Sequence, residues 1–436
     1  MTLDQLLKAF RDRAVSRVIF KLLSPNDNIK NQPYFGSDLS VLRFFPHGEI
    51  TVDEDRRGKR YKIPLDFAWI SGENGQDQIG SGSQLILYPQ YPEIRFSGFA
   101  RGTTGRHREV MRVRDEGRVL VLGISDSGRI YGFTCFKDDP VAEALRSIDT
   151  VGESGIFFEL QPLGKRLGTE LELLATLREV HNKGWIESKR LNSDGEILKC
   201  NASNCGGYTL EAELGIRPNG IAEPDFLGWE VKAHSVSAFG RRSTKAVTLM
   251  TPEPSIGQYK SEGAEWFIWE YGYEDIRGRP NRLNFSSPHR IGERNDKTGL
   301  TLRVHGFDSA EQKVTDADGC VALLNDNDEI AAGWPFAHLL TIWSTKHAKA
   351  VYIPYLKNPQ LPLSYCYGAQ VQLCEGTNLN YLLRSIDQGS MYYDPGIKLE
   401  NATSPDADLK KRSQFRIGIH EVGSLYKSRR LVDMLD

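Results

Sequence analysis

The chain has 436 residues, which at about 100 to 200 residues per domain suggests two or three domains. Lys and Arg total 55 and Asp and Glu total 57, so the formal net charge is -2. This balance excludes a uniformly basic nucleic-acid coat protein and an acidic disordered chain. Positive charge that binds DNA must therefore be local. No apolar run approaches the ~18 residues that a transmembrane helix needs, so we expect no membrane partner.

The first 162 residues are predicted to form a mainly β domain. They open with an amphipathic helix, because Leu3, Leu6, Leu7 and Phe10 recur at helical spacing, and the charges in this segment argue against a signal peptide. Short strand-like runs follow, at residues 18–23, 63–70, 84–88, 93–99, 118–124, 129–133 and 157–160. Many short strands separated by Gly, Pro, Asn and Asp turns favour a barrel or sandwich. A linker is expected over residues 163–168.

Residues 169–436 are predicted to mix helices and strands. The first helix should place on one face the leucines Leu167, Leu171, Leu174 and Leu177. A second helix is expected to begin near Thr209, and a third over 335–346 with Pro335 in its first turn. Predicted strands lie at 185–189, 321–324, 330–332 and 350–355. Such a mixture indicates an α/β core.

Six cysteines, at positions 135, 200, 205, 320, 366 and 374, include no C-x-x-C pair. We therefore predict reduced thiols in a cytoplasmic protein, with neither a disulfide framework nor a zinc site. The acidic runs 316–319 and 325–328 lack the ligand spacing of calcium loops and are interpreted as turns.

One constellation of charged residues has the spacing of a catalytic site. Glu230 and Lys232 lie two apart on a predicted strand, so both should point to the same face of the sheet. Trp229 and Val231 should point the other way, into the core. A bend at the Leu227–Gly228 pair, which allows the chain to reverse, would bring an upstream carboxylate beside Glu230.

That upstream carboxylate is Asp225. Two carboxylates can hold magnesium ions, which stabilise charge on a phosphate and lower the pKa of an attacking water. Lys232 would add positive charge near the water or the phosphate, and Glu211, on a preceding helix, could be a third acidic ligand. An exposed, salt-bridged hairpin would give the same D-x4-E-x-K spacing, so the spacing alone leaves both interpretations open.

The motif resembles the PD-(D/E)xK nuclease signature. From about residue 170 onward the chain is similar to the MvaI/BcnI restriction endonucleases, which are related in fold to the mismatch-repair nickase MutH. The matching segments run in order at 184–190, 209–211, 224–226, 230–234, 248–254 and 413–417. The resemblance implies a restriction-endonuclease-like α/β core, a mixed sheet flanked by helices. It also implies metal binding by Asp225, Glu230 and Glu211, a catalytic role for all three and for Lys232, and Mg²⁺ as the cofactor.

Residues 20–28, 34–36, 44–46 and 101–102 resemble the effector domain of the EcoRII restriction enzyme. That resemblance implies a DNA-binding pseudobarrel ahead of the catalytic core; the alternative is a generic β-rich scaffold. Two basic clusters fit DNA contacts, although a charge run can also be a solvated face. The predicted contacts are Arg101, Arg106, Arg108 and Arg112, and later Lys410, Lys411, Arg412 and Arg416.

We therefore expect a magnesium-dependent, sequence-specific endonuclease of the type II restriction class that cuts double-stranded DNA. The resemblance further implies a cytoplasmic monomer, which could serve phage defence with a separate methyltransferase. Two alternatives stay open. One is a MutH-like repair nickase with the same site. The other is a DNA-binding regulatory protein with an inactive nuclease core, against which the intact Asp225, Glu230 and Lys232 argue.

Overall fold

The computed structural model describes residues 1–25, 32–37, 39–55, 58–70, 76–89, 93–125, 127–147, 153–154, 156–160, 169–217, 224–241, 243–360 and 362–436. The chain divides into two compact units, Met1–Glu172 (unit 1) and Leu173–Asp436 (unit 2), and each is described by itself. The predicted linker, residues 163–168, lies outside the described residues. Among the helices of the described ranges, none is long and apolar enough to cross a membrane.

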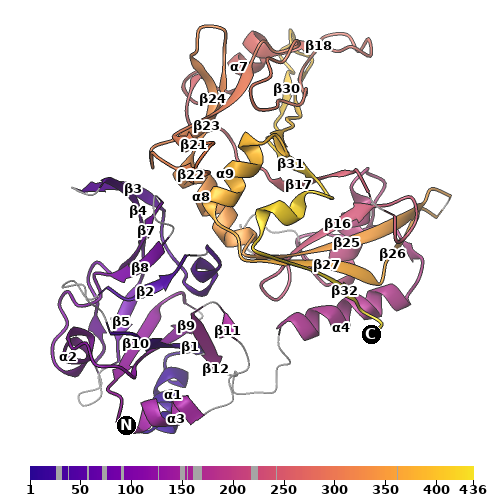
Figure 1. The fold of residues 1–436 in the computed structure, drawn as a ribbon. Helices are drawn as coiled ribbons and strands as arrows, with labels where there is room; N and C mark the ends of the chain where they lie inside the picture. The colour runs from indigo at the N-terminus through magenta and orange to yellow at the C-terminus, as the bar shows by residue number, and fades with distance from the viewer. Residues whose placement is uncertain are drawn as a thin grey trace. The chain divides into compact units, whose positions relative to one another are not determined.

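Unit 1 is built on two sheets, coloured indigo to purple in Figure 1. The seven-stranded sheet has the order β11-β12-β1-β9-β10-β5-β6 and the five-stranded sheet the order β2-β8-β7-β4-β3. The strands are β1 (Val15–Leu23), β2 (Tyr34–Gly36), β3 (Thr51–Asp55), β4 (Gly58–Pro64), β5 (Phe67–Trp69), β6 (Gln78–Ile79), β7 (Gln84–Tyr88), β8 (Glu93–Ser97), β9 (Arg118–Ser125), β10 (Ile130–Cys135), β11 (Glu153–Ser154) and β12 (Phe157–Leu160). The helices are α1 (Leu3–Arg11), α2 (Arg106–Arg112), α3 (Pro140–Ser147) and the short η1 (Leu39–Phe44).

The first helix and most of the strands predicted for unit 1 are present, but helices α2 and α3 and strand β3 were not predicted. Helix α1 begins with a capping box, in which Thr2 and Gln5 bond to each other's backbone, and it buries Leu6 and Phe10. The single strand predicted over 63–70 is wrong. Strand β4 ends at Pro64, which has no N–H to continue a ladder, and β5 pairs in the other sheet.

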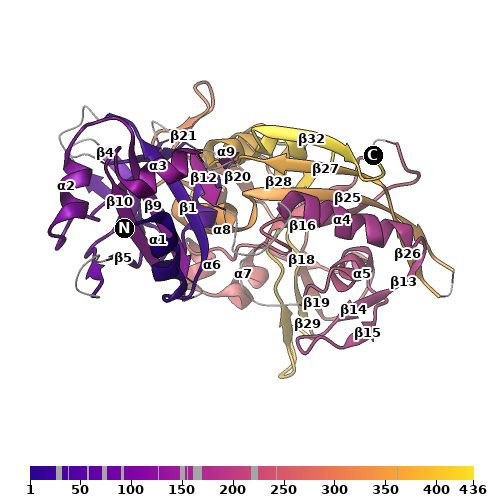
Figure 2. The ribbon, with the colours of Figure 1, turned by 90° about the horizontal axis from the view of Figure 1, so that it is seen from below.

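The main sheet of unit 2 has the order β13-β26-β25-β27-β32, and β16 runs parallel to β25. Its strands are β13 (Ile186–Glu187), β16 (Glu230–Ser235), β25 (Lys349–Asn358), β26 (Ser364–Tyr367), β27 (Gln370–Glu375) and β32 (Ser428–Asp433). Helices α4 (Thr169–Asn182) and α5 (Cys205–Glu213) share one hydrophobic core with this sheet (Figures 1 and 2). The predicted mixed sheet flanked by helices is thus confirmed for unit 2.

Two helix predictions need correction. Helix α4 buries Leu173, Leu177 and Val180, whereas Leu171 is 58% exposed, so the predicted leucine face is right for Leu177 and wrong for Leu171. Leu167 lies outside the described residues. Helix α5 begins at Cys205, ahead of the predicted start near Thr209. A glycine at position 206 permits this early start, because a side chain there would collide with the Tyr355 ring.

The rest of unit 2 holds smaller sheets and further helices. The sheets have the orders β17-β31-β28, β18-β19-β29-β30, β20-β23-β24, β14-β15 and β21-β22. Their strands are β14 (Lys189–Leu191), β15 (Ile197–Lys199), β17 (Ala246–Met250), β18 (Tyr273–Glu274), β19 (Arg282–Phe285), β20 (Thr301–His305), β21 (Phe307–Asp308), β22 (Lys313–Val314), β23 (Cys320–Leu324), β24 (Ile330–Pro335), β28 (Met391–Tyr393), β29 (Ile397–Glu400), β30 (Asp408–Lys410) and β31 (Phe415–Gly418). The helices are α6 (Gln258–Ser261), α7 (Ala264–Tyr271), α8 (Phe336–Lys346), α9 (Leu379–Asp387) and the short η2 (Val422–Leu425).

Candidate active site

A tight hairpin brings two carboxylates together at the start of β16. Phe226 and Trp229 exchange backbone hydrogen bonds of 3.0 and 2.8 Å across a two-residue turn. Both turn residues have positive φ, 51° at Leu227 and 81° at Gly228, as in hairpin turns of the primed types. Asp225 and Glu230 flank the paired residues, so they lie opposite each other on the same face of the hairpin.

Successive side chains of strand β16 alternate between the hydrophobic core and the candidate site. Trp229 and Val231 are buried in the core that α4 and α5 share with the sheet, as predicted. Glu230 and Lys232 alternate with them and lie on the opposite face. In the neighbouring strand β25, the residue beside Lys232 is Tyr352, so the site is bordered by the most buried part of the sheet.

The side chains at this hairpin are joined by two hydrogen bonds. The Lys232 ammonium donates to Glu230 Oε1 at 2.5 Å, and the Val231 N–H donates to Asp225 Oδ2 at 3.0 Å. Glu230 is 0% exposed, and among the described residues its other oxygen, Oε2, has no hydrogen-bond partner. A buried carboxylate oxygen without a partner is costly unless a ligand completes it.

Burial and neighbouring charges shift the pKa values of Asp225 and Lys232. Burial raises the pKa of Asp225, and the Glu230 carboxylate raises it further. Burial acts to lower the pKa of Lys232, but the charges of Glu230 and Asp225 outweigh it, so that pKa is raised overall. Lys232 is therefore an ammonium at neutral pH, held between carboxylates.

Glu211, in the last turn of α5, lies close enough to this site to feel its charges. Burial, and next the Asp225 carboxylate, raise the pKa of Glu211 to about 7. Yet among the described residues no three His, Cys, Asp or Glu side chains converge as a group that could hold a metal. The hairpin brings Asp225, Glu230 and Lys232 together, and Glu211 interacts electrostatically with all three from α5.

The donor set still fits magnesium. This ion prefers oxygen ligands, keeps several of its waters, and is commonly bound by one or two carboxylates together with substrate phosphates. Asp225 and Glu230 supply two carboxylates on one face, and the unpartnered Oε2 of Glu230 is a free ligand atom. A complete protein cage is not needed for such a site.

Several residues near the site were not found from the sequence. Tyr352 and Tyr426 hydroxyls lie 3.3 Å apart, and the Tyr426 hydroxyl lies 3.4 Å from His347 Nδ1. His347 Nε2 lies 2.8 Å from the Leu249 carbonyl, so Nε2 carries the proton and Nδ1 accepts from Tyr426. Lys346 ends α8, and its charge lowers the pKa of Glu211 and of Asp225.

In unit 1 the predicted DNA contacts are all exposed, but one of them forms an ion pair. Arg101, Arg108 and Arg112 are exposed, the latter two on α2. Arg106 is exposed too, but it forms an ion pair with Asp139. His107, within the same basic run, is buried: its ring stacks on Trp69, and Nε2 lies 2.7 Å from the Ile70 carbonyl.

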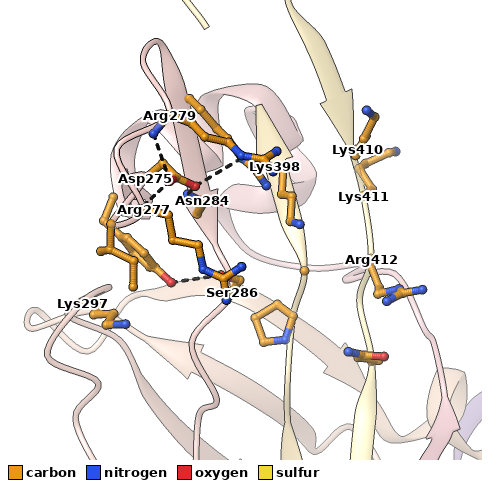
Figure 3. Close-up of a pocket in the computed structure, with 16 residues that line it drawn as sticks. Asp275, Arg277, Arg279, Asn284, Ser286, Lys297, Lys398, Lys410, Lys411 and Arg412 are labelled. Carbon is orange, nitrogen blue, oxygen red and sulfur yellow. Dashed lines mark hydrogen bonds and ion pairs between the residues drawn. The ribbon is translucent and has the colours of Figure 1, made fainter. Parts of the chain in front are cut away.

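In unit 2 three predicted contacts line one basic cavity of about 690 Å³, between the β18–β19 hairpin and β29–β30 (Figure 3). Its cationic residues are Arg277, Arg279, Arg282, Lys297, Lys398, Lys410, Lys411 and Arg412. The fourth predicted contact, Arg416, lies outside this lining; it pairs with Asp394 at 2.6 Å and donates to the Ala246 carbonyl at 3.0 Å. No local pattern indicated that the arginines of residues 277–282 would meet Lys410–Arg412, more than a hundred residues later.

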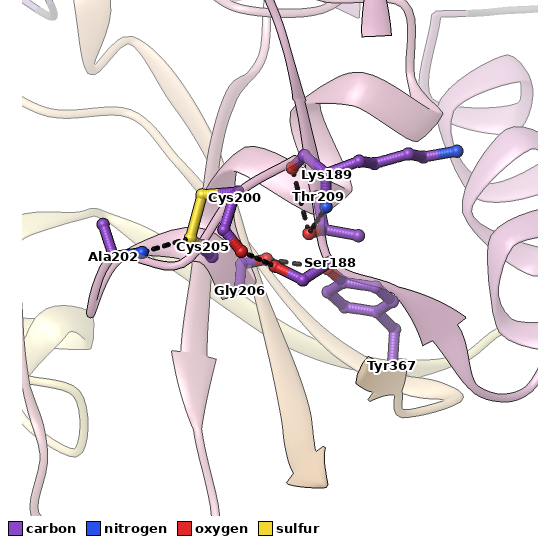
Figure 4. The surroundings of a disulfide bond; sticks show 8 residues. All are labelled: Ser188, Lys189, Cys200, Ala202, Cys205, Gly206, Thr209 and Tyr367. Carbon is purple, nitrogen blue, oxygen red and sulfur yellow. Dashed lines mark hydrogen bonds between the residues drawn. A yellow bond between two sulfur atoms is a disulfide. The ribbon is translucent and has the colours of Figure 1, made fainter. Parts of the chain in front are cut away.

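The prediction of reduced thiols is wrong for one pair of cysteines. Cys200 and Cys205 form a disulfide with Cα atoms 5.8 Å apart, at the start of α5 (Figure 4). The Ser188 hydroxyl donates to the Cys200 carbonyl at 2.6 Å, and the Tyr367 hydroxyl donates to the Gly206 carbonyl at 2.7 Å. The bond therefore lies in a tightly held segment of the helix that carries Glu211. The cysteines at 135, 320, 366 and 374 are free.

Comparisons with known proteins identify a family for this chain. The sequence pattern of the MvaI/BcnI restriction endonuclease family matches residues 174–426. Among solved structures, restriction endonuclease MvaI with its cognate DNA substrate is 17% identical, with a TM-score of 0.46, over 61% of this chain and 99% of that chain. MvaI without DNA is 15% identical, with a TM-score of 0.34, over 62% of this chain and 100% of that chain.

No curated protein gave a match. The family match nevertheless covers more than half of the 436 residues, and it includes the Asp225–Lys232 hairpin. It confirms the family resemblance that the order of the sequence segments indicated. The chain belongs to the MvaI/BcnI restriction endonuclease family and is a type II restriction-like deoxyribonuclease.

Proposed function

We propose that this nuclease hydrolyses phosphodiester bonds in double-stranded DNA with Mg²⁺ held by Asp225 and Glu230. The observation that carries the proposal is the Oε2 atom of Glu230, fully buried beside Asp225 and without a partner among the described residues. When bound, the ion would polarise the scissile phosphate and lower the pKa of the attacking water. The charge of the two carboxylates favours a cation at this position.

The chain's own residues would perform the remaining tasks. Lys232, an ammonium at neutral pH, would neutralise negative charge that develops on the phosphate. The Val231 N–H holds the Asp225 carboxylate in place at 3.0 Å. Glu211, with a pKa of about 7, is proposed as a further acidic group that acts on the metal from outside the hairpin.

Two surfaces are proposed to bind the duplex. In unit 2 the basic cavity, with Lys410, Lys411 and Arg412 on its wall, would contact backbone phosphates. Arg416 was predicted as a contact, but its internal bonds to Asp394 and Ala246 support a structural role instead. In unit 1 the proposal is an effector-like pseudobarrel that binds DNA through Arg101, Arg106, Arg108 and Arg112.

The single Asp225–Lys232 hairpin supports a monomer that cuts both strands in two successive nicks. Within a cytoplasmic restriction–modification system, a separate methyltransferase would protect the host's own sites and the nuclease would cut phage DNA. A MutH-like nickase would use the same hairpin but stop after the first strand.

Supercoiled plasmid tests the proposal. With Mg²⁺ the full-length protein should first give nicked circles and then linear DNA, and with EDTA it should give neither. Asp225→Asn should abolish cleavage while the variant still shifts the plasmid in a gel. Persistent nicked circles without linear product would indicate a nickase. Full activity in EDTA, or in Asp225→Asn, would contradict the proposed metal site.

A further inference from the structure

The hairpin that joins β18 to β19 carries an exposed aliphatic side chain among cations. Ile276 is 75% exposed, more than any other large hydrophobic residue in the described part of the chain. It lies one residue before Arg277 and three before Arg279, and all three residues line the basic cavity. An apolar tip beside a cationic surface suits a partner that is both anionic and apolar.

The hairpin tip is held in a fixed shape. The Asp275 carboxylate accepts from the Arg277 N–H at 2.9 Å and the Arg279 N–H at 3.3 Å through one oxygen (Figure 3). Its other oxygen accepts from Asn284 Nδ2 at 3.1 Å and lies 3.5 Å from Arg282 Nε. These contacts of Asp275 therefore hold the loop that carries Ile276 in a fixed shape. They also compensate the negative charge of Asp275, the carboxylate that lines the cavity.

A second set of bonds fixes the base of the loop. The Asn281 side-chain oxygen accepts from the Thr403 N–H and from its hydroxyl, both at 2.9 Å. The Asn281 carbonyl also accepts from the Ala402 N–H at 3.0 Å. These bonds tie the base of the hairpin to the turn that follows β29.

The cations around this tip are largely unpaired. Within the described ranges no carboxylate forms an ion pair with Arg277, Arg279, Lys398, Lys411 or Arg412, while Lys410 pairs with Asp408 at 3.1 Å. A cluster of unpaired cations attracts an anionic partner, and a run of phosphates supplies several negative charges at once. Duplex DNA combines phosphates with an apolar base stack, and proteins that bend DNA insert aliphatic side chains between base pairs in this way.

We infer that the 275–281 loop is a wedge that enters a DNA groove and places Ile276 between adjacent base pairs, while the basic cavity holds the neighbouring phosphates. The inference rests on the proposed function, since it assumes duplex DNA as the substrate. Unstacking at Ile276 would bend and unwind the substrate, which costs free energy that depends on the base step. The wedge would therefore add sequence preference without hydrogen bonds to base edges.

The change in plasmid supercoiling on protein binding measures such a wedge, and the target sequence need not be known. Closed-circular plasmid is relaxed by a metal-independent topoisomerase in EDTA with saturating full-length protein, and the protein is then removed. The wild-type protein should leave the plasmid negatively supercoiled, because each wedge unwinds the helix. Ile276→Ala should lose at least half of that shift, and its affinity in a gel-shift titration should fall by roughly ten-fold or less.

Leu431→Ala is the matched control, because Leu431 is 69% exposed in the same unit and does not line the cavity. This variant should keep the full topoisomer shift. A wild-type protein that binds plasmid and cleaves it with Mg²⁺, but leaves the topoisomers unmoved, would overturn the wedge and assign the tip to an acidic protein partner. A wild-type protein that neither binds nor cleaves plasmid would instead overturn the proposed function.

Discussion

The Lys232 ammonium lies 2.5 Å from Oε1 of Glu230, two residues earlier on the same strand. The lysine side chain is 23% exposed and the glutamate side chain 1%, so a half-buried cation compensates one oxygen of a fully buried anion. The second oxygen of Glu230 has no such partner among the described residues. The pair is thus incomplete at one oxygen only, Oε2 of Glu230.

The first prediction concerns this pair. Lys232→Ala should lower the rate of plasmid cleavage by at least about a hundred-fold, because a positive charge positioned at the reacting phosphate is lost. DNA binding should remain, since one cation among many contributes little to the total affinity. Single-turnover cleavage and gel-shift titration measure the two effects separately.

Lys349→Ala is the matched control for this loss. Lys349 is 18% exposed and pairs with Glu375 at 2.9 Å on the neighbouring strand, so it resembles Lys232 in burial and pairing. Cleavage by this variant should stay within a few-fold of wild type. Equal losses in both variants would mean that the sheet, and not the chemistry, had been damaged.

The second prediction concerns DNA binding by unit 1. Arg101→Ala should weaken binding of the full chain to any duplex and reduce the slope of log affinity against log salt by about 1, because one phosphate contact is lost. Arg129→Ala, which removes an exposed arginine paired with Asp66 at 3.0 Å, should leave that slope unchanged. Identical salt slopes for Arg101→Ala and wild type would exclude Arg101 as a phosphate contact.

The third prediction concerns the Cys200–Cys205 bond. Cys200→Ser should lower the free energy of unfolding by about 2 kcal/mol, because a short loop in the unfolded chain is no longer closed. Urea unfolding with and without reductant measures this. Reductant should destabilise the wild type and leave the variant unaffected, and Cys366→Ser, which removes a free, half-buried thiol, should behave as wild type. If the urea midpoint of the wild-type protein did not change with reductant, the bond would be absent in solution.

The fourth prediction concerns acid stability. His289 is 0% exposed, bonds to Thr298 Oγ1 at 2.8 Å, and burial lowers its pKa from 6.5 to about 4. The folded form therefore disfavours the proton that the unfolded chain accepts below pH 6.5. Stability should be fully present above pH 6.5 and should fall between pH 6.5 and 4, by up to about 1.4 kcal/mol per pH unit from this residue.

Urea unfolding at a series of pH values tests the effect of His289. His289→Gln retains a polar partner for Thr298 but cannot bind the proton, so its stability should depend less steeply on pH in this window. His347, whose pKa burial lowers to about 3, should keep part of the acid sensitivity in that variant. A slope identical to wild type would show that His289 does not titrate on unfolding.

The Asp225–Lys232 hairpin could be predicted because its geometry is local. Alternation along a strand places Glu230 and Lys232 on one face, and a two-residue turn places Asp225 opposite, whatever the rest of the chain does. The family resemblance was readable for the same reason, since its segments are short and ordered. The hairpin core residues Trp229 and Val231 followed from the same alternation.

What the sequence did not reveal depends on contacts between distant segments. The Tyr352–Tyr426–His347 chain joins residues 74 and 79 positions apart, and no local pattern marks it. The leucine spacing of α4 gave the helix but placed Leu171 inside, because neighbouring leucines fit two faces equally well. Cys200 and Cys205 pair across the turn that precedes α5, and their spacing alone does not predict that turn.

Because the turn at Leu227 and Gly228 has two residues, Asp225 and Glu230 lie on the same face of the hairpin. The number of residues between the two carboxylates is therefore important for the site. One inserted residue would shift the register of the arm that carries Asp225 against the arm that carries Glu230, so the side chains of the first arm would move to the opposite face. Asp225 would then face the core while Glu230 kept its place. Relatives with a different spacing must therefore close their hairpins with another turn, and libraries that vary loop length here would sample inactive chains almost exclusively. Substitution at Leu227 is the freer route to diversity, since glycine or asparagine adopts its φ of 51° with less strain.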